Sequence, residues 1–238
     1  MTERGRPAVS RVAVALVLAS VVVLAGCSAG AGRTFAFTLT YAVQPSAGSA
    51  PTDQDVQTVA ITMGARLSGT GLADYRVRTP GSGRITVEAS PASALDSVRS
   101  LVGQPGHLAI VPLGTTLAMP GATVDLATHP ALFGEREVNR ATVNKDAAGS
   151  PLVALQLTQP AAQTLFTWSA SHTGEALGIV MDGALVTVIM VAVPIEGGLL
   201  DVGGLEPLAA GQFAAVVNGG PLSFAILEQS AVASSPAP

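Results

Sequence analysis

The pattern of apolar positions divides residues 34–112 into strands and helices in a regular order. Large apolar side chains alternate with small or polar ones over 34–43, which predicts a half-buried strand. Apolar residues recur at helical spacing from Val56 to Leu67, behind a capping residue at Thr52 or Asp53. We expect strands over 34–43, 75–79, 84–89 and 107–112, a helix that begins after Thr52 or Asp53 and ends at Gly69 or Gly71, and a second helix over 91–103. This β-α-β-β-α-β order is that of a ferredoxin-like unit.

A second series of elements follows an irregular segment over 113–134 that is interrupted by Pro120-Gly121 and His129-Pro130. Asp182-Gly183, between two apolar runs, is a strong signal for a two-residue hairpin. We expect helices that begin near Gln159 and Glu206, and strands over 138–144, 152–158, 176–181, 184–193, 199–202 and 222–229. The fold class predicted for the whole chain is α+β.

These elements predict two subdomains. We expect a ferredoxin-like base over 34–112, closed by the strand over 222–229, and an inserted α+β head over 135–221. The segment 113–134 would then be a linker or hinge between them. Residues 230–238, rich in Ser, Ala and Pro, are expected to form a disordered tail.

The N-terminus has the features of a bacterial lipoprotein signal peptide. Arginines precede an apolar run over 12–26, and Leu24-Ala25-Gly26-Cys27 matches the lipobox. We expect cleavage between Gly26 and Cys27, acylation of the Cys27 thiol, and a short tether over 27–33. An uncleaved anchor is the alternative, but the run has about 15 residues, whereas a membrane-spanning helix needs about 20.

A lipid on Cys27 would hold the protein on the outer face of the cell membrane, or on the outer membrane of a two-membrane bacterium. Cys27 is the single cysteine, so no disulfide is expected and the apolar core must hold the fold. The mean hydropathy is +0.49. No apolar run after residue 27 approaches about 18 residues, so we expect no membrane-spanning helix there.

The charge balance argues against a nucleic-acid partner. The chain carries 12 basic and 16 acidic residues, a net charge of −4. Cleavage before Cys27 would remove three arginines and one glutamate, and so make the mature chain more acidic. Nucleic-acid binding requires a basic surface. Membrane attachment would therefore depend on the lipid alone, without help from a basic patch.

No motif indicates a catalytic, cofactor or metal site. His107, His129 and His172 lack a second histidine or a carboxylate at metal-ligand spacing. The glycine clusters do not have the order of a phosphate-binding loop, and Gly-x-Ser-x-Gly is absent. Asp182 is interpreted as a turn residue rather than a general base. We therefore expect neither enzymatic activity nor a cofactor or metal.

Phe166 and Trp168 are the candidate partner-binding residues. They lie two positions apart on the helix that begins near Gln159, so they face different sides of it. We expect one to pack on a sheet and the other to be exposed. Edge strands are a second candidate, because an extended polypeptide can add to the edge of a sheet.

Ordered sets of motifs run along both halves. The second half contains Gly149-Ser150-Pro151, Ala162-Gln163-Thr164-Leu165-Phe166, Leu177-Gly178-Ile179-Val180-Met181-Asp182-Gly183, Pro194-Ile195-Glu196-Gly197-Gly198 and Asn218-Gly219-Gly220-Pro221-Leu222. The first half contains Arg66-Leu67, Gly71-Leu72-Ala73-Asp74 and Arg84-Ile85-Thr86-Val87-Glu88. Together they resemble the extracytoplasmic base and head (P1) domain of the SecD subunit of the protein-export machinery.

This resemblance implies a base and a hinged head, but the chain departs from the family in three respects. Family members often have Ala-Pro soon after the Asp-Gly turn, where this chain has Val186-Thr187-Val188-Ile189, which predicts a smooth strand in place of a bend. The family's Leu-Asp-Leu-x-Gly-Gly entry segment is missing, and no membrane-spanning region follows residue 229. The resemblance therefore implies a binding module for exported polypeptide or an envelope protein rather than a proton-coupled motor. The alternative is a lipoprotein that binds a small ligand in the cleft between base and head.

Overall fold

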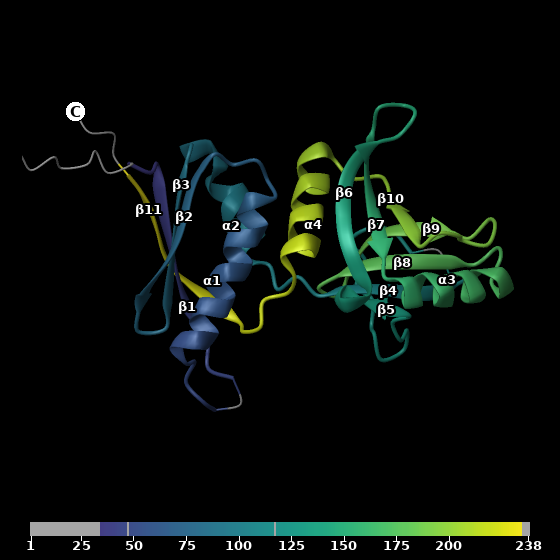
Figure 1. Cartoon of the computed structure of the whole chain (residues 1–238), viewed down its shortest axis with the longest axis horizontal. Helices are drawn as coiled ribbons and strands as arrows, with labels where there is room; N and C mark the ends of the chain where they lie inside the picture. The colour runs from purple at the N-terminus through teal and green to yellow at the C-terminus, as the bar shows by residue number, and fades with distance from the viewer. Residues whose placement is uncertain (1–33, 47, 117, 235–238) are drawn as a thin grey trace, which may run out of the picture. The chain divides into compact units, whose positions relative to one another are not determined.

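The computed structural model describes residues 34–46, 48–116 and 118–234. These residues form four α-helices and three antiparallel sheets, as Figure 1 shows. The α+β class predicted from the sequence is therefore confirmed.

The base is a four-stranded sheet with the order β11-β1-β3-β2, covered on one face by two helices. Its elements are β1 (Phe37–Val43), α1 (Asp53–Ser68), β2 (Asp74–Gly81), β3 (Arg84–Ser90), α2 (Leu95–Gly103) and β11 (Ile226–Ala233). β1 alternates buried and half-buried residues along its length, as the sequence pattern predicts. Its apolar face packs with Ile85 and Val87 of β3 against Val59 and Met63 of α1.

Local chemistry accounts for the start of α1. The Thr52 side chain accepts a hydrogen bond from the Asp55 backbone N–H, and the Asp55 carboxylate accepts one from the Thr52 N–H. This reciprocal capping box satisfies donors that the first turn of a helix leaves unpaired.

The fourth strand of the base is β11, which follows the whole inserted segment in the sequence. It pairs with β1 from Phe37–Ala233 to Val43–Ile226. The strand expected over 222–229 therefore lies about four residues further along, and residues 230–233 are part of a sheet rather than a disordered tail. Residues 235–238 of the expected tail lie outside the described residues.

The strand expected over 107–112 exists as β4 (Leu108–Gly114), but it does not belong to the base. β4 pairs with β8 (Ala176–Met181) and β5 (Phe133–Gly134) in a sheet with the order β5-β4-β8-β9. The assignment of this strand to the base was wrong, because strand order along the chain does not reveal which strands pair.

The head contains this sheet, a second sheet with the order β10-β7-β6, and two helices. Its remaining elements are β6 (Val138–Lys145), β7 (Pro151–Leu157), α3 (Gln159–Ser171), β9 (Ala184–Met190), β10 (Leu199–Val202) and α4 (Pro207–Gly219). Most buried apolar residues of both sheets and of α3 and α4 belong to one cluster that continues into the base, and one face of the β5-β4-β8-β9 sheet contributes to a second, smaller cluster.

The segment 113–134 packs on the head and does not connect the two subdomains. All six residues of β8 are buried. Leu177 and Ile179 belong to the main core, whereas Val180 belongs to a smaller cluster that includes Leu113 and Val124. A strand buried on both faces needs a cover on each, and this segment supplies the second cover. The expectation of a linker over 113–134 was therefore wrong.

The chain crosses between base and head at residues 104–107, after α2, and at residues 220–225, after α4. The two crossings hydrogen-bond to each other, since the Leu222 N–H donates to the Pro105 carbonyl at 2.8 Å. We call these two segments the joint. α4 contacts α1 and α2 of the base as well as β6 and β7 of the head.

Candidate functional site

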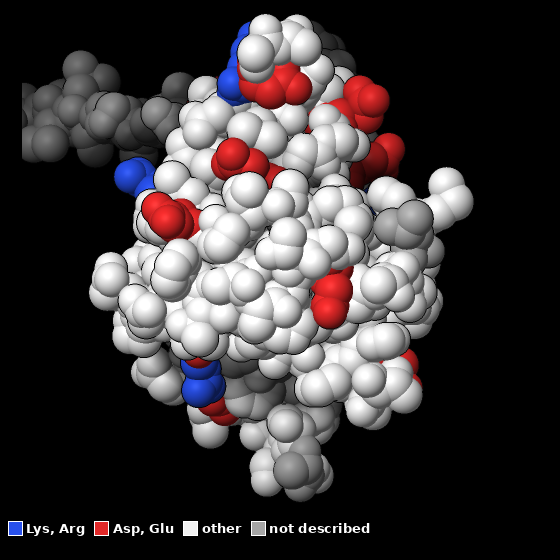
Figure 2. Space-filling view, turned by 90° about the vertical axis from the view of Figure 1, so that its right-hand side faces the viewer, with Lys and Arg blue, Asp and Glu red and all other residues white. Residues whose placement is uncertain are grey.

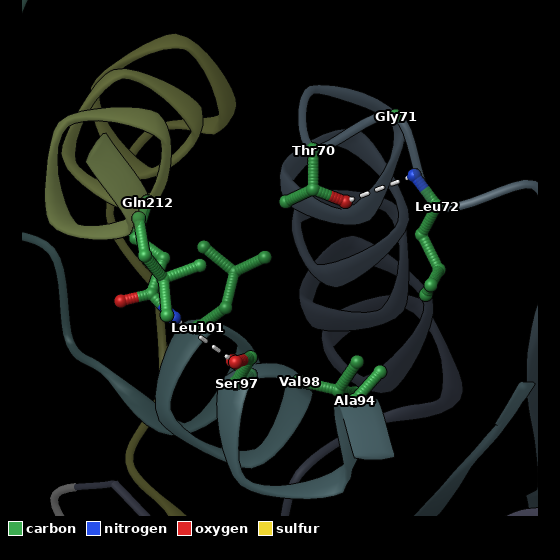
Figure 3. A pocket seen from close by; sticks show the side chains of 9 residues that line it. Thr70, Gly71, Leu72, Ala94, Ser97, Val98, Leu101 and Gln212 are labelled. Carbon is green, nitrogen blue, oxygen red and sulfur yellow. Dashed lines mark hydrogen bonds between the residues drawn. The ribbon is translucent and has the colours of Figure 1, made fainter. Parts of the chain in front are cut away.

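An apolar groove lies between α1, α2 and α4. It encloses about 270 Å³ and is lined by Thr70, Gly71, Leu72, Ala94, Ser97, Val98, Leu101, Leu208 and Gln212. Figure 3 shows the end of α1, the length of α2 and Gln212 of α4 around this space. Its polar groups are partly occupied, because Gln212 donates to the Ser97 carbonyl at 3.4 Å and Thr70 accepts from the Leu72 N–H at 3.3 Å.

The groove suits an apolar ligand better than a charged one. None of its lining residues carries a charge, and Leu208 at its rim is 64% exposed. Ligand pockets in proteins combine apolar walls with a few polar groups in this way. The walls of the groove come from helices of both base and head. Its position is therefore compatible with either occupant suggested by the sequence, a protein partner or a small ligand between base and head.

The sheet edges of the protein differ in how they are guarded. β2 carries Arg76, Arg78 and Pro80, and β6 carries Arg140 and Lys145. β10 has four residues and β5 has two. Charge, proline and short length are the devices by which proteins prevent an edge strand from pairing with another chain.

β9 lacks charge, proline and short length, although its pairing with β8 contains a register shift between Leu185 and Thr187. Its seven residues, Ala184–Met190, include neither a charge nor a proline. Residues 121–122 cover the start of its outer edge through two backbone hydrogen bonds to Leu185, of 2.7 and 2.8 Å. Beyond Leu185, β9 has no strand partner on the side away from β8 within the described residues. β9 is thus an open edge whose last residue, Met190, is 51% exposed.

The surface on the head side is also poor in charge. Figure 2 shows a face that is mostly uncharged, with separated acidic side chains and few basic ones. Charged residues make up 12% of the chain. Such a surface offers little electrostatic selectivity, so any binding there must come from main-chain hydrogen bonds and apolar contacts.

Phe166 and Trp168 occupy different environments on α3. Phe166 is 37% exposed, beside a shallow hollow that Glu196 and Gly197 also line. Trp168 packs against the core and stacks on His172, with ring centroids 4.5 Å apart. The structure does not bring the two side chains into one site, and Trp168 has a packing role.

Arg66 is the one charged side chain that is fully buried among the described residues. Its guanidinium donates to the carbonyls of Leu101, Gln104, Pro105 and Gly220, so it touches both crossings of the joint. Burial lowers the pKa of Arg66 to about 10, and the negative charge of Asp182 opposes that shift. From the sequence, Arg66 has no predicted role except as part of a motif, because its partners are backbone groups.

Asp182 lies on the other side of the joint, in the turn between β8 and β9. Its φ of 51° lies in the left-handed region, as expected for a hairpin turn residue. Its carboxylate accepts hydrogen bonds from the N–H groups of Gly106 and His107, both at 2.8 Å. The turn interpretation was incomplete, because the side chain also holds the first crossing.

The remaining sequence predictions concern metal binding, membrane-spanning helices and the lipidation site. Within the described residues no group of three or more His, Cys, Asp or Glu side chains is placed to hold a metal ion. No helix in that part of the chain is both long and apolar enough to cross a bilayer. Gly26 and Cys27, the expected cleavage and lipidation residues, lie outside the described residues.

Comparisons with known proteins agree with the fold. Residues 114–224 match the model of the SecDF P1 head subdomain. The protein translocase subunit SecD of Rhodobacter capsulatus is 23% identical over 186 residues, which cover 71% of this chain and 33% of that protein. The match to the head model begins at residue 114, so it includes the segment that the sequence assigned to a linker.

Two solved structures share the architecture. A crystal structure of SecDF in the super-membrane-facing form has a TM-score of 0.66 at 20% identity, over 82% of this chain and 30% of that one. A structure of SecDF, described as a membrane component that enhances protein export, has a TM-score of 0.62 at 20% identity, over 81% of this chain and 98% of that one. The chain thus has the fold of a SecDF P1 domain and spans about a third of the SecD relative.

Proposed function

We propose that this protein is a non-enzymatic, extracytoplasmic binding module that holds an extended segment of exported polypeptide at the open edge of β9. The observation that carries the proposal is the uncharged, proline-free edge beyond Leu185. The resemblance to a P1 domain of the export apparatus supports an exported polypeptide as the partner.

The proposed binding is strand addition. Main-chain hydrogen bonds from β9 would supply affinity for any extended chain, and the half-exposed side chains of Val186 and Val188 would favour apolar segments. Folded proteins offer no free extended backbone, so such a site selects unfolded chains. This selectivity is suited to a protein that meets polypeptides as they leave the membrane.

The test uses a fluorescent, uncharged, apolar peptide and its analogue with alternate backbone amides N-methylated. Strand addition requires that the first peptide binds and that the analogue, which lacks half of the main-chain donors, does not. Met190→Lys places a charge on the edge at an exposed position, so it should weaken binding at least tenfold.

Leu227→Lys is the matched control, because Leu227 is 54% exposed on β11, the edge strand of the base sheet. It should leave the affinity unchanged. Equal binding of the two peptides, or loss of binding in Leu227→Lys alone, would refute the assignment to β9.

A small apolar ligand in the groove between α1, α2 and α4 is the second candidate, favoured by the uncharged lining of that space. Ala94→Phe would fill the groove with a larger side chain. If ligand extracted from the purified protein disappears in Ala94→Phe while peptide binding persists, the groove and the β9 edge are separate sites.

We further propose that a lipid on Cys27 holds the module at the membrane. The lipobox supports this anchor, and residues 28–33 would tether the folded part within about 20 Å of the bilayer. Two or three acyl chains are sufficient for stable attachment.

A further inference from the structure

The joint is built around one buried cation. Arg66, on α1 of the base, reaches the Pro105 carbonyl at 2.9 Å in the first crossing and the Gly220 carbonyl at 2.7 Å in the second. A buried guanidinium is costly unless its donors are satisfied. Four backbone carbonyls satisfy it here, so both crossings are bound to the same helix.

Glycines make room for this cation. A Cβ atom at Gly106 would collide with the Arg66 guanidinium, and one at Gly219 would lie 2.5 Å from Arg66 Cγ. Gly106 and Gly220 also have φ values of 88° and 79°, which L side chains rarely adopt. Each crossing therefore contains a glycine with a positive φ at or next to a carbonyl that accepts a hydrogen bond from Arg66.

The head contributes one side chain to the same point. Asp182 Oδ1 accepts from the Gly106 and His107 N–H groups at 2.8 Å, and the His107 carbonyl accepts from the Asp182 N–H at 2.9 Å. Arg66 thus binds the carbonyl of Pro105, and Asp182 binds the N–H groups of the next two residues, Gly106 and His107.

We propose that Arg66 and Asp182 form a two-sided polar latch at the joint, in which release of Asp182 from residues 106–107 lets the head turn relative to the base while both stay folded. The Arg66 side is permanent because four carbonyls depend on it. The Asp182 side is the one that opens, since a single carboxylate holds it and one of its two donor residues, His107, is exposed, whereas Gly106 is buried.

The test measures the distance between nitroxide labels on the base and the head. Cysteines replace Ile61 on α1 and Ala170 on α3, both exposed, in the full chain carrying Cys27→Ser, so that these are the only thiols. Asp182→Gly tolerates the left-handed φ but removes the carboxylate. It should broaden the distance distribution or add a second peak, whereas a label pair at Asn144 and Ala170, both in the head, should be unchanged.

Asp146→Gly is the matched control. Asp146 also accepts from two backbone N–H groups in a head hairpin, those of Ala148 and Ser150 at 2.9 and 2.8 Å, but it touches no crossing. The latch is refuted if Asp182→Gly leaves the base–head distribution as it is in the parent protein, or if Asp146→Gly broadens it equally.

Hydrogen exchange of the unmodified chain gives a second measurement that does not depend on a variant folding. If the latch opens, the amides of Gly106 and His107 should exchange through an opening with a smaller denaturant dependence than the amide of Ile179 in β8. Exchange of all three only through global unfolding would also refute the latch.

Discussion

Asn218 and Ala141 bind each other through two hydrogen bonds of 2.8 Å. The Asn218 Oδ1 atom accepts from the Ala141 N–H, and the Asn218 Nδ2 atom donates to the Ala141 carbonyl. Asn218 is near the end of α4, and Ala141 is in β6, an edge strand of its sheet. The side-chain amide thus occupies the backbone groups that another strand would use, and it holds α4 to the head.

Asn218→Ala should lower the free energy of unfolding by about 1–3 kcal/mol, because it leaves the N–H and carbonyl of a buried residue without partners. Urea denaturation measures this change. Asn144→Ala, at an exposed position on the same strand, is the control and should change stability by less than about 0.5 kcal/mol. Equal effects of the two substitutions would show that the paired amide does not stabilise the attachment of α4.

Gly198 and Gly197 provide a matched pair of substitutions beside α3. Both have positive φ values, 67° and 73°, so alanine at either position should cost about 1–2 kcal/mol. A Cβ at Gly198 would also collide with the Ala162 side chain, whereas nothing lies within 4 Å of one at Gly197. Gly198→Ala should therefore be the more destabilising by about a further 1–3 kcal/mol. Thermal and urea unfolding that rank the two equally would contradict this packing.

Tyr41 should make stability fall at alkaline pH. Burial, and then the negative charge of Glu228, raise the pKa of Tyr41 above its ordinary value of 10.0. Above pH 10 the unfolded chain loses this proton while the folded chain keeps it, so the unfolding free energy falls by about 1.4 kcal/mol per pH unit.

The comparison of wild type with Tyr41→Phe isolates this contribution. Arg66, whose pKa is lowered to about 10, acts in the opposite direction over the same pH range, but it is present in both proteins. The stability difference between them should therefore shrink or reverse as pH rises from 9 to 11. A difference that does not vary with pH would show that Tyr41 titrates alike in both states.

Cys27→Ser should prevent lipidation without unfolding the protein. The expected result is loss of the protein from the membrane fraction, or accumulation of an uncut precursor, and loss of acyl-chain labelling. Its far-UV circular dichroism and unfolding midpoint should match those of a chain that begins at Ser28. Continued acylation, or continued membrane attachment of the cleaved variant, would contradict the lipobox interpretation.

Most secondary structure in this protein was predictable from local patterns. The alternation in β1, the capping residues before α1 and the Asp182-Gly183 turn each depend on a few neighbouring residues. The order of helices and strands over residues 34–112 and the α+β class follow from these local signals. The apolar run over 176–181 even indicated a strand buried on both faces, a signal from which the role of residues 113–134 as a cover could have been inferred.

Tertiary structure alone decided which strands pair and which charged side chains bind the segments between base and head. β4 joins the head and β11 completes the base, because pairing depends on burial of side chains far apart in the chain. Arg66 and Asp182 are bound by backbone groups, Arg66 to residues 35–154 positions away and Asp182 to residues 75–76 positions away, which no local pattern encodes. The sequence by itself determined the elements and an expected lipid anchor. Only folding brings two glycines, one arginine and one aspartate together at the joint, because a buried cation needs carbonyls that several separate segments must supply.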